Sequence, residues 1–278
     1  MRNYLAGAAL LIAASGAAQA QQGSEWKQVL NLPKGQSMPR EGAEILGIEL
    51  GDGYAEAKAK LEKLGAEGAP QNRPGSPLKE ISLTFRLQPS GASQVTALSF
   101  VSVISLDRMM PGVSRPYEDS LRVYFSAPSS GHQIKGVERS ISYNAESDQP
   151  RVSEIIGRLK EKMKVEPQFY ESRETAEFVF QFNDGKAFTP PRTPVNECHT
   201  WFEVTDSASI SSINPKGNCD AVMIVKVNFG ISRDHAKYIL FRLSDNERIK
   251  ANLTADFGFI REYVRAFQER SKGAPPKL

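Results

Sequence analysis

Apolar and polar residues alternate over several stretches in the first half of the chain, which is the pattern of β-strands with one buried face. The alternation is strict from Ile81 to Leu87. Further strands are predicted at residues 95–106, 120–126 and 133–143. The segments between them are too short for parallel crossovers, and glycine and proline punctuate them. We therefore expect an antiparallel meander.

Two segments of this half have the helical period instead. The first helix is predicted at residues 54–64, after a short strand at 44–50, with Asp52 as its N-cap and Gly65 just past its end. The second starts near Pro150. Its apolar stripe consists of Val152, Ile155, Ile156, Leu159 and Met163.

The second half loosely repeats this plan. Alternation over residues 176–182 leads into Asn183-Asp184-Gly185, a hairpin-turn sequence. Three more strands and a final helix are predicted, at residues 199–204, 221–229, 238–243 and 255–269. The pattern favours an α+β fold of antiparallel sheets, each covered by one or two helices. We expect two similar-sized halves that meet near residues 164–173.

The first twenty residues have the three-part order of a secretion signal. Arg2 supplies a positive charge, an apolar run covers residues 5–14, and Ala18 and Ala20 fit an A-x-A cleavage site. The alternative is an uncleaved anchor, but the run is shorter than the roughly 20 apolar residues that span a bilayer. Cleavage after Ala20 predicts a periplasmic or secreted protein. No cysteine follows that site, and no later segment is long and apolar enough for a transmembrane helix, so we expect neither lipid anchor nor membrane span.

These patterns predict five segments. They are a signal peptide at 1–20, a flexible linker at 21–42, a first α+β domain at 43–165, a second at 166–270, and a disordered tail at 271–278.

Charge and cysteine content narrow the possible functions. The chain has 35 basic and 32 acidic residues, a balance that argues against nucleic-acid binding. The two cysteines, Cys198 and Cys219, are expected to form a disulfide in an oxidising compartment. Zinc ligation together with His199 and His235 is the alternative, but the spacing lacks the paired ligands of structural zinc sites.

No motif in the sequence indicates catalysis. The chain has three histidines, and His132 lies in a predicted turn where we expect it to be exposed. Neither a G-x-S-x-G elbow nor a phosphate-binding glycine loop occurs. The carboxylate pairs Asp107 with Glu118 and Glu171 with Glu174 are expected to be solvated. We therefore expect no enzyme activity, no cofactor and no metal.

The segments Ile45–Gly51 and Tyr54–Leu61 combine paired glycines with a following helix. This arrangement resembles the SmpA/BamE-like class of bacterial envelope proteins. The matching positions are Leu46, Gly47, Leu50, Gly51, Glu56, Ala57 and Leu61. The resemblance covers roughly residues 43–165 and implies a helix packed on an antiparallel sheet, with a role in protein contact or envelope scaffolding. The chain departs from that class in lacking the anchor cysteine and in having a long second half.

The sequence thus favours a soluble periplasmic binding or scaffolding protein without catalytic activity, with another envelope protein as its partner. One alternative is a proteinaceous inhibitor of a periplasmic enzyme, with aromatic side chains as anchors. The other is an unrecognised hydrolase, which would need a deep pocket holding a carboxylate or histidine with a strongly perturbed pKa.

Overall fold

A computed structural model describes most of the 278-residue chain. The described residues are 26–34, 37–39, 42–68, 78–87, 96–188, 198–214 and 217–271. The predicted signal peptide and residues 272–278 of the predicted tail lie outside them.

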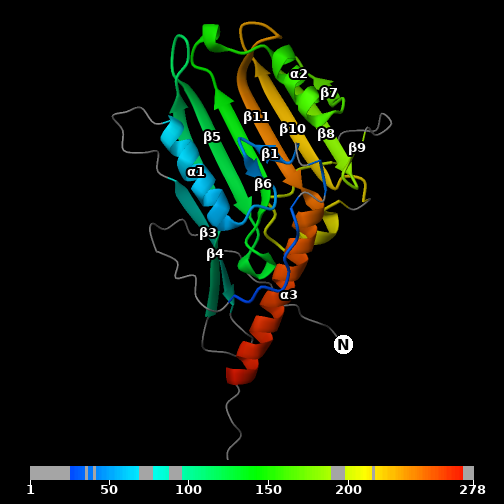
Figure 1. The fold of residues 1–278 in the computed structure, drawn as a ribbon. Helices are drawn as coiled ribbons and strands as arrows, with labels where there is room; N and C mark the ends of the chain where they lie inside the picture. The colour runs from blue at the N-terminus through cyan, green and yellow to red at the C-terminus, as the bar shows by residue number, and fades with distance from the viewer. Residues whose placement is uncertain are drawn as a thin grey trace, which may run out of the picture.

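The strands of the main body form one antiparallel sheet of nine strands (Figure 1). The order is β3-β4-β5-β6-β11-β10-β8-β7, and β9 pairs with β8. The bounds are β3 (Lys79–Leu87), β4 (Thr96–Met110), β5 (Tyr117–Phe125), β6 (Ile134–Ser142), β7 (Gln168–Glu171), β8 (Thr175–Asn183), β9 (Lys186–Phe188), β10 (Ala221–Phe229) and β11 (Ala236–Asp245). The α+β class, the meander from β3 to β6 and the β8–β9 hairpin are confirmed.

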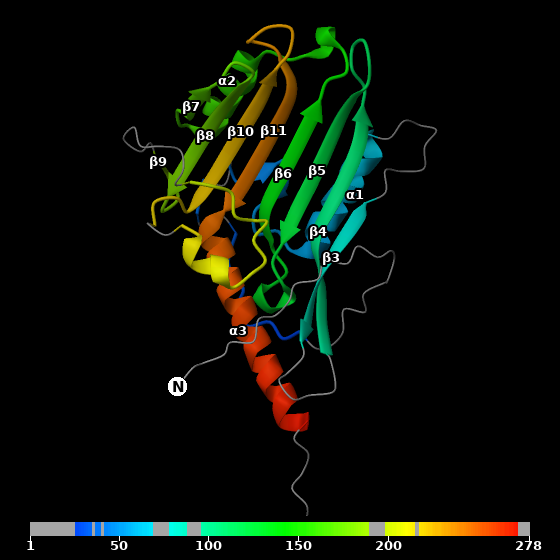
Figure 2. The same ribbon diagram turned by 180° about the vertical axis from the view of Figure 1, so that it is seen from behind.

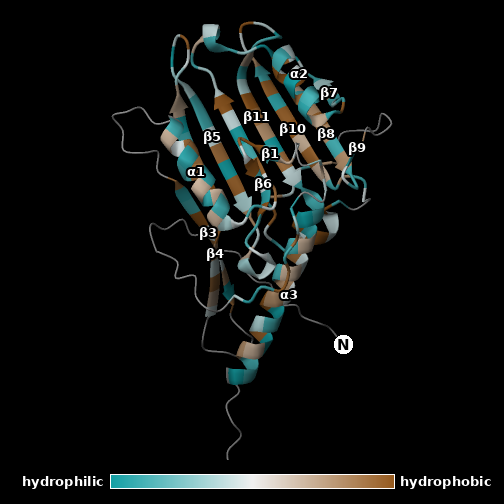
Figure 3. Cartoon of the chain, viewed as in Figure 1, coloured by the Kyte–Doolittle hydropathy of each residue, from teal (hydrophilic) through white to brown (hydrophobic). Residues whose placement is uncertain are grey.

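The expectation of separate sheets is wrong, because β6 of the first half pairs directly with β11 of the second. In this pairing Val137 lies opposite Leu243, and Ile141 lies opposite Ile239. The apolar face of the sheet therefore continues across the junction. Figure 3 shows the alternating hydropathy along the strands that produces this face.

One face of the sheet carries α1 (Tyr54–Gly68), α2 (Val152–Met163) and a small hairpin of β1 (Glu44–Ile45) and β2 (Ile48–Glu49) (Figure 1). The main core lies beneath them, with buried side chains such as Leu61, Ile104, Val123, Val137, Ile156, Phe180 and Val225. None of the helices in the described residues has an apolar stretch long enough to cross a bilayer.

The opposite face is largely uncovered in Figure 2. Residues 198–214, which include the 3-10 helix η5 (Ala208–Ser212), and α3 (Asn246–Ser271) lie near one end of it. Two further 3-10 helices are η2 (Pro128–Ser130) and η3 (Glu146–Asp148).

Four local predictions differ from the structure. The strand expected at 44–50 is a hairpin, because Leu46 and Gly47 have the left-handed φ values 54° and 76°. Gly53, not Asp52, supplies the first helical carbonyl of α1, to the Ala57 N–H. This helix also continues past Gly65, and α3 begins at Asn246, well before the predicted residue 255.

Residues 199–204 do not form the predicted strand. The segment does not join the sheet, but its apolar side chains pack onto it. The Phe202 ring centroid lies 4.4 Å from that of Tyr124. A Cβ at Gly136 would lie 2.4 Å from the Phe202 side chain, so this contact requires glycine on β6. The apolar pattern of the segment thus comes from packing across the strands.

Residues 26–34, which belong to the segment expected to be a flexible linker, pack against the sheet and α3. The Trp26 ring stacks on Phe259 with centroids 5.2 Å apart, and its Nε1 donates to the Ser99 carbonyl at 3.1 Å. The Val29 N–H donates to the carbonyl of Ser129. This part of the segment is therefore built into the fold.

The predicted disulfide between Cys198 and Cys219 is present, with Cα atoms 5.6 Å apart. Both cysteines are buried against Val179 and Val222 on the otherwise open face. The bridge is compatible with an oxidising, extracytoplasmic compartment. Because the two cysteines are bonded to each other, the alternative of zinc ligation by their thiols is wrong.

Candidate functional site

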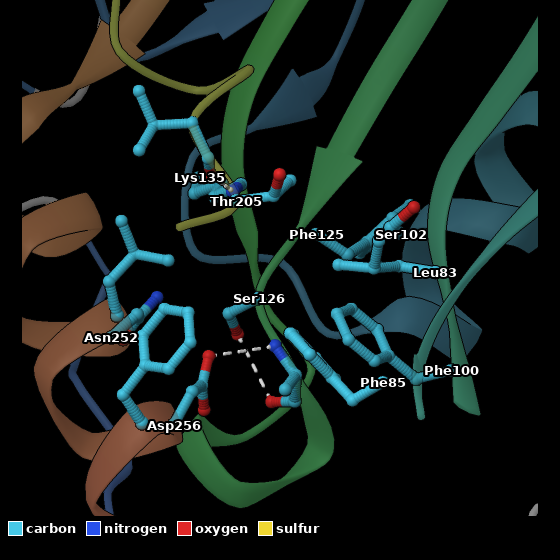
Figure 4. Close-up of a pocket in the computed structure, with 14 residues that line it drawn as sticks. Leu83, Phe85, Phe100, Ser102, Phe125, Ser126, Lys135, Thr205, Asn252 and Asp256 are labelled. Carbon is cyan, nitrogen blue, oxygen red and sulfur yellow. Dashed lines mark hydrogen bonds between the residues drawn. The ribbon is translucent and has the colours of Figure 1, made fainter. Parts of the chain in front are cut away.

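A small cavity lies between the sheet and the N-terminal half of α3 (Figure 4). Its apolar walls include Leu83, Phe85, Phe100, Phe125, Leu253 and Phe257. Lys135, Asn252 and Asp256 are among its polar groups. The cavity has a volume of ≈ 20 Å³, which is room for about one water molecule.

Lys135 reaches the cavity from a bulge in β6. The register shifts where Tyr124 lies opposite Gly136 and Phe125 opposite Ile134, so Lys135 has no residue opposite it. The side chain is buried, and its Nζ donates to the carbonyl of Val204 at 3.2 Å. Burial lowers the pKa of Lys135 to about 8, and the nearby carboxylate of Asp256 opposes this shift in part.

Asn252 enters the cavity wall from α3. Its side chain is only 1 % exposed, yet neither Nδ2 nor Oδ1 has a hydrogen-bond partner among the described residues. A buried amide without partners is costly and is rare in native proteins. This amide therefore marks a place for a water molecule or a polar group of a ligand.

Asp256 lies one helical turn after Asn252 and has a different role. Its Oδ2 accepts the Ala127 N–H at 3.1 Å, and its Oδ1 accepts the Ser129 hydroxyl at 2.6 Å. Burial raises the pKa of Asp256, while these hydrogen bonds lower it. The carboxylate thus anchors α3 to the turn after β5 and supplies negative charge near Lys135.

The cavity was not predicted from the sequence, although α3 carries a signal of it. Asn252 and Asp256 lie at helical spacing within the apolar stripe of Ile249, Leu253 and Ile260. Polar residues on a buried stripe indicate a polar site in a core. The helix predicted from the sequence begins at residue 255, so Asn252 lies outside it.

The expectation that His132 is exposed is wrong. Its ring stacks on Tyr54, with centroids 4.6 Å apart and an interplanar angle of 5°. Its Nε2 bonds to the carbonyl of Val101 at 2.8 Å. Burial lowers the pKa of His132, which favours the neutral ring. His132 is a packing residue between α1 and the sheet.

A second histidine contacts a serine, a contact that was not predicted from the sequence. The Ser232 hydroxyl lies 2.7 Å from Nδ1 of His235 in the exposed turn between β10 and β11. The neighbouring Asp234 carboxylate accepts the Ser153 N–H at 3.0 Å, at the start of α2. In the part of the chain that the structure describes, no carboxylate bonds to the other His235 nitrogen, as a catalytic triad would require. We therefore interpret the contact between Ser232 and His235 as part of the structure of the turn between β10 and β11.

The carboxylate pairs noted in the sequence are exposed, as expected. Asp107 accepts the Ser120 hydroxyl at 2.7 Å, and Glu171 forms an ion pair with Arg233 at 3.1 Å. Across the described ranges, no group of three or more histidine, cysteine or carboxylate side chains could hold a metal ion.

Comparisons with known proteins add no relative: no family model, no curated protein and no solved structure matches this chain. The SmpA/BamE-like resemblance therefore stays a prediction.

Proposed function

We propose that this chain is an exported binding protein without catalytic activity and that the cavity beneath α3 receives the polar end of its ligand. The observation that carries the proposal is Asn252, whose buried amide lacks partners within the described residues. Apolar walls with a few convergent polar groups are typical of small-molecule sites. Lys135 and Asn252 supply such groups.

The chemistry of the site favours an amphipathic ligand. A space of ≈ 20 Å³ admits only a small head group. Lys135 and the Asn252 amide can both donate hydrogen bonds, so they suit a head that accepts them, such as a carboxylate. Leu83 and Phe85 are only half-buried on the edge strand β3 and offer an apolar surface to the rest of the ligand.

Titration with decanoate, followed by calorimetry, tests this proposal. We expect saturable binding to the wild-type protein and at least tenfold weaker binding to the Lys135→Met and Asn252→Leu variants, since one charge-assisted hydrogen bond is worth about 1.5–3 kcal/mol. Lys226→Met is the matched control, because Lys226 is exposed on β10. A wild-type protein that does not bind decanoate, or variants that bind it equally well, would refute the proposal and leave the cavity as a site for structural water.

The perturbed pKa values of Asp256 and Lys135 also bear on the alternative of a hydrolase. One feature weighs against it: both Asp256 oxygens already accept hydrogen bonds from the turn around η2.

Export is a separate part of the proposal. It is supported by the predicted signal at residues 1–20 and by compatibility of the disulfide with an oxidising compartment. Mass spectrometry of the mature N-terminus tests it: we expect Gln21 as the first residue, and a mature protein that retains Met1 would overturn it.

A further inference from the structure

Strand β3 forms one edge of the sheet, and no described strand pairs with its outer side (Figure 2). Nine residues give it a length of about 30 Å, and six of the nine are exposed. It contains no proline. The strand at the other end of the order, β7, has only four residues. Long exposed edges are places where another strand can add to a sheet.

The backbone of β3 alternates between facing β4 and facing outward. The carbonyl of Ile81 faces β4, because it accepts the hydroxyl of Ser102 at 3.2 Å. The neighbouring even-numbered residues, including Ser82 and Thr84, therefore direct their N–H and C=O groups away from the sheet. No described residue bonds to these groups, so within the described part of the chain they form a ladder that a second strand can join.

The sequence of β3 is complementary to a second copy of itself when the two copies lie antiparallel with Leu83 opposite Leu83. In that register Glu80 lies opposite Arg86, Ile81 opposite Phe85, and Ser82 opposite Thr84. A two-fold axis perpendicular to a sheet passes through a pair of identical residues. Among the registers in which one residue of β3 lies opposite its own copy, only the register centred on Leu83 places oppositely charged residues of the strand, Glu80 and Arg86, across from each other.

The charged side chains are also available for this pairing. Glu80 is held by Lys58 at 2.8 Å and by the Tyr54 hydroxyl at 2.7 Å, yet its side chain remains 33 % exposed. Arg86 is exposed and has no ion-pair partner among the described residues. Opposite charges and aromatic–β-branched pairs directly across two strands stabilise their association.

We propose that β3 pairs antiparallel with β3 of a second copy of this chain, with Leu83 on the two-fold axis. The sheet then continues from one protomer into its partner, and both protomers place α1 on the same side of it. This inference does not depend on a ligand in the cavity.

Charge exchange tests the interface through sedimentation velocity of the purified full-length protein. We expect a dimer for the wild type, a monomer for Arg86→Glu, which sets two carboxylates opposite each other, and a restored dimer for the double variant Glu80→Arg/Arg86→Glu. A monomeric wild type, a dimeric Arg86→Glu variant, or a folded double variant that stays monomeric would each overturn the proposal.

Cross-linking tests the register. Residues directly opposite in an antiparallel pair have Cα atoms about 4.5–5.5 Å apart, which allows a disulfide. Leu83→Cys is therefore expected to give a covalent dimer on a non-reducing gel. Lys79→Cys, on the same edge but away from the axis, is expected to stay monomeric on that gel. Absence of the Leu83→Cys dimer, or an equal yield from Lys79→Cys, would contradict the register.

Discussion

Replacement of Lys135 by methionine tests whether the cavity holds a buried ammonium at an energetic cost. Methionine keeps most of the length of the side chain and removes its charge. The variant loses one hydrogen bond, to the Val204 carbonyl. We expect Lys135→Met to be more stable than the wild type at neutral pH.

The magnitude follows from the pKa of Lys135, which falls from 10.5 to about 8. At about 1.4 kcal/mol per pKa unit, the buried charge costs about 3 kcal/mol below pH 8. Between pH 8 and 10.5 the unfolded chain binds the proton while the folded chain has lost it. The free energy of unfolding of the wild type therefore rises with pH in this window, by that amount in total.

Urea unfolding of both proteins at pH 7, 8, 9 and 10 measures this effect. The difference between the two free energies of unfolding removes the contribution of groups that both proteins share. We expect the advantage of the variant to shrink steadily as the pH rises from 8 toward 10.5. The described residues contain no free cysteine that could exchange with the disulfide at alkaline pH.

Parallel pH profiles for the two proteins would refute this reasoning. They would show that Lys135 keeps an ordinary pKa in the folded state and is solvated there. Lys226→Met serves as the control. Because Lys226 is exposed, its replacement should change the free energy of unfolding by no more than about 0.5 kcal/mol at any of these pH values.

Three further predictions concern stability, each measured by urea unfolding. Asp119→Ala should lower the free energy of unfolding by about 3–5 kcal/mol, because the 1 % exposed carboxylate neutralises two buried or partly buried arginines. The control Asp107→Ala, which changes a 60 % exposed side chain, should lower it by less than about 0.5 kcal/mol. Equal losses for the two variants would contradict the argument. Reduction of the disulfide, which links residues 21 apart, should lower stability by about 3 kcal/mol, and an unchanged midpoint would show that it is dispensable. The lowered pKa of His132 means that the unfolded state takes up its proton first as the pH falls below about 6.5, so wild-type stability should decline there more than that of His132→Asn; identical declines would show that His132 titrates normally.

Part of the candidate site was within reach of the sequence. The period-two pattern placed Leu83 and Phe85 on one face of a strand, as the structure has them. The stripe of α3 contained Asn252, but the predicted start of the helix missed it. Lys135 could not be predicted as buried, because its position depends on a bulge in β6 and on cover from residues 204 and 205.

The sequence by itself determined much of the local structure, and it indicated the disulfide. Hydrophobic periodicity depends on which face of an element is buried, so it predicted most strands, the first two helices and the meander. The cysteine pair and the predicted export indicated the bridge, and the spacing of the cysteines and histidines did not support a zinc site.

Only the tertiary structure decided which distant elements meet. Periodicity specifies a buried face and not a neighbour, so the pairing of β6 with β11, and with it the single sheet, could not be predicted. The same physical reason applies to three further features. They are the burial of His132, the packing of Phe202 on Gly136, and the position of Lys135 and Asn252 around one cavity. Each arises from contacts between residues far apart in the chain, whose energies depend on the assembled fold.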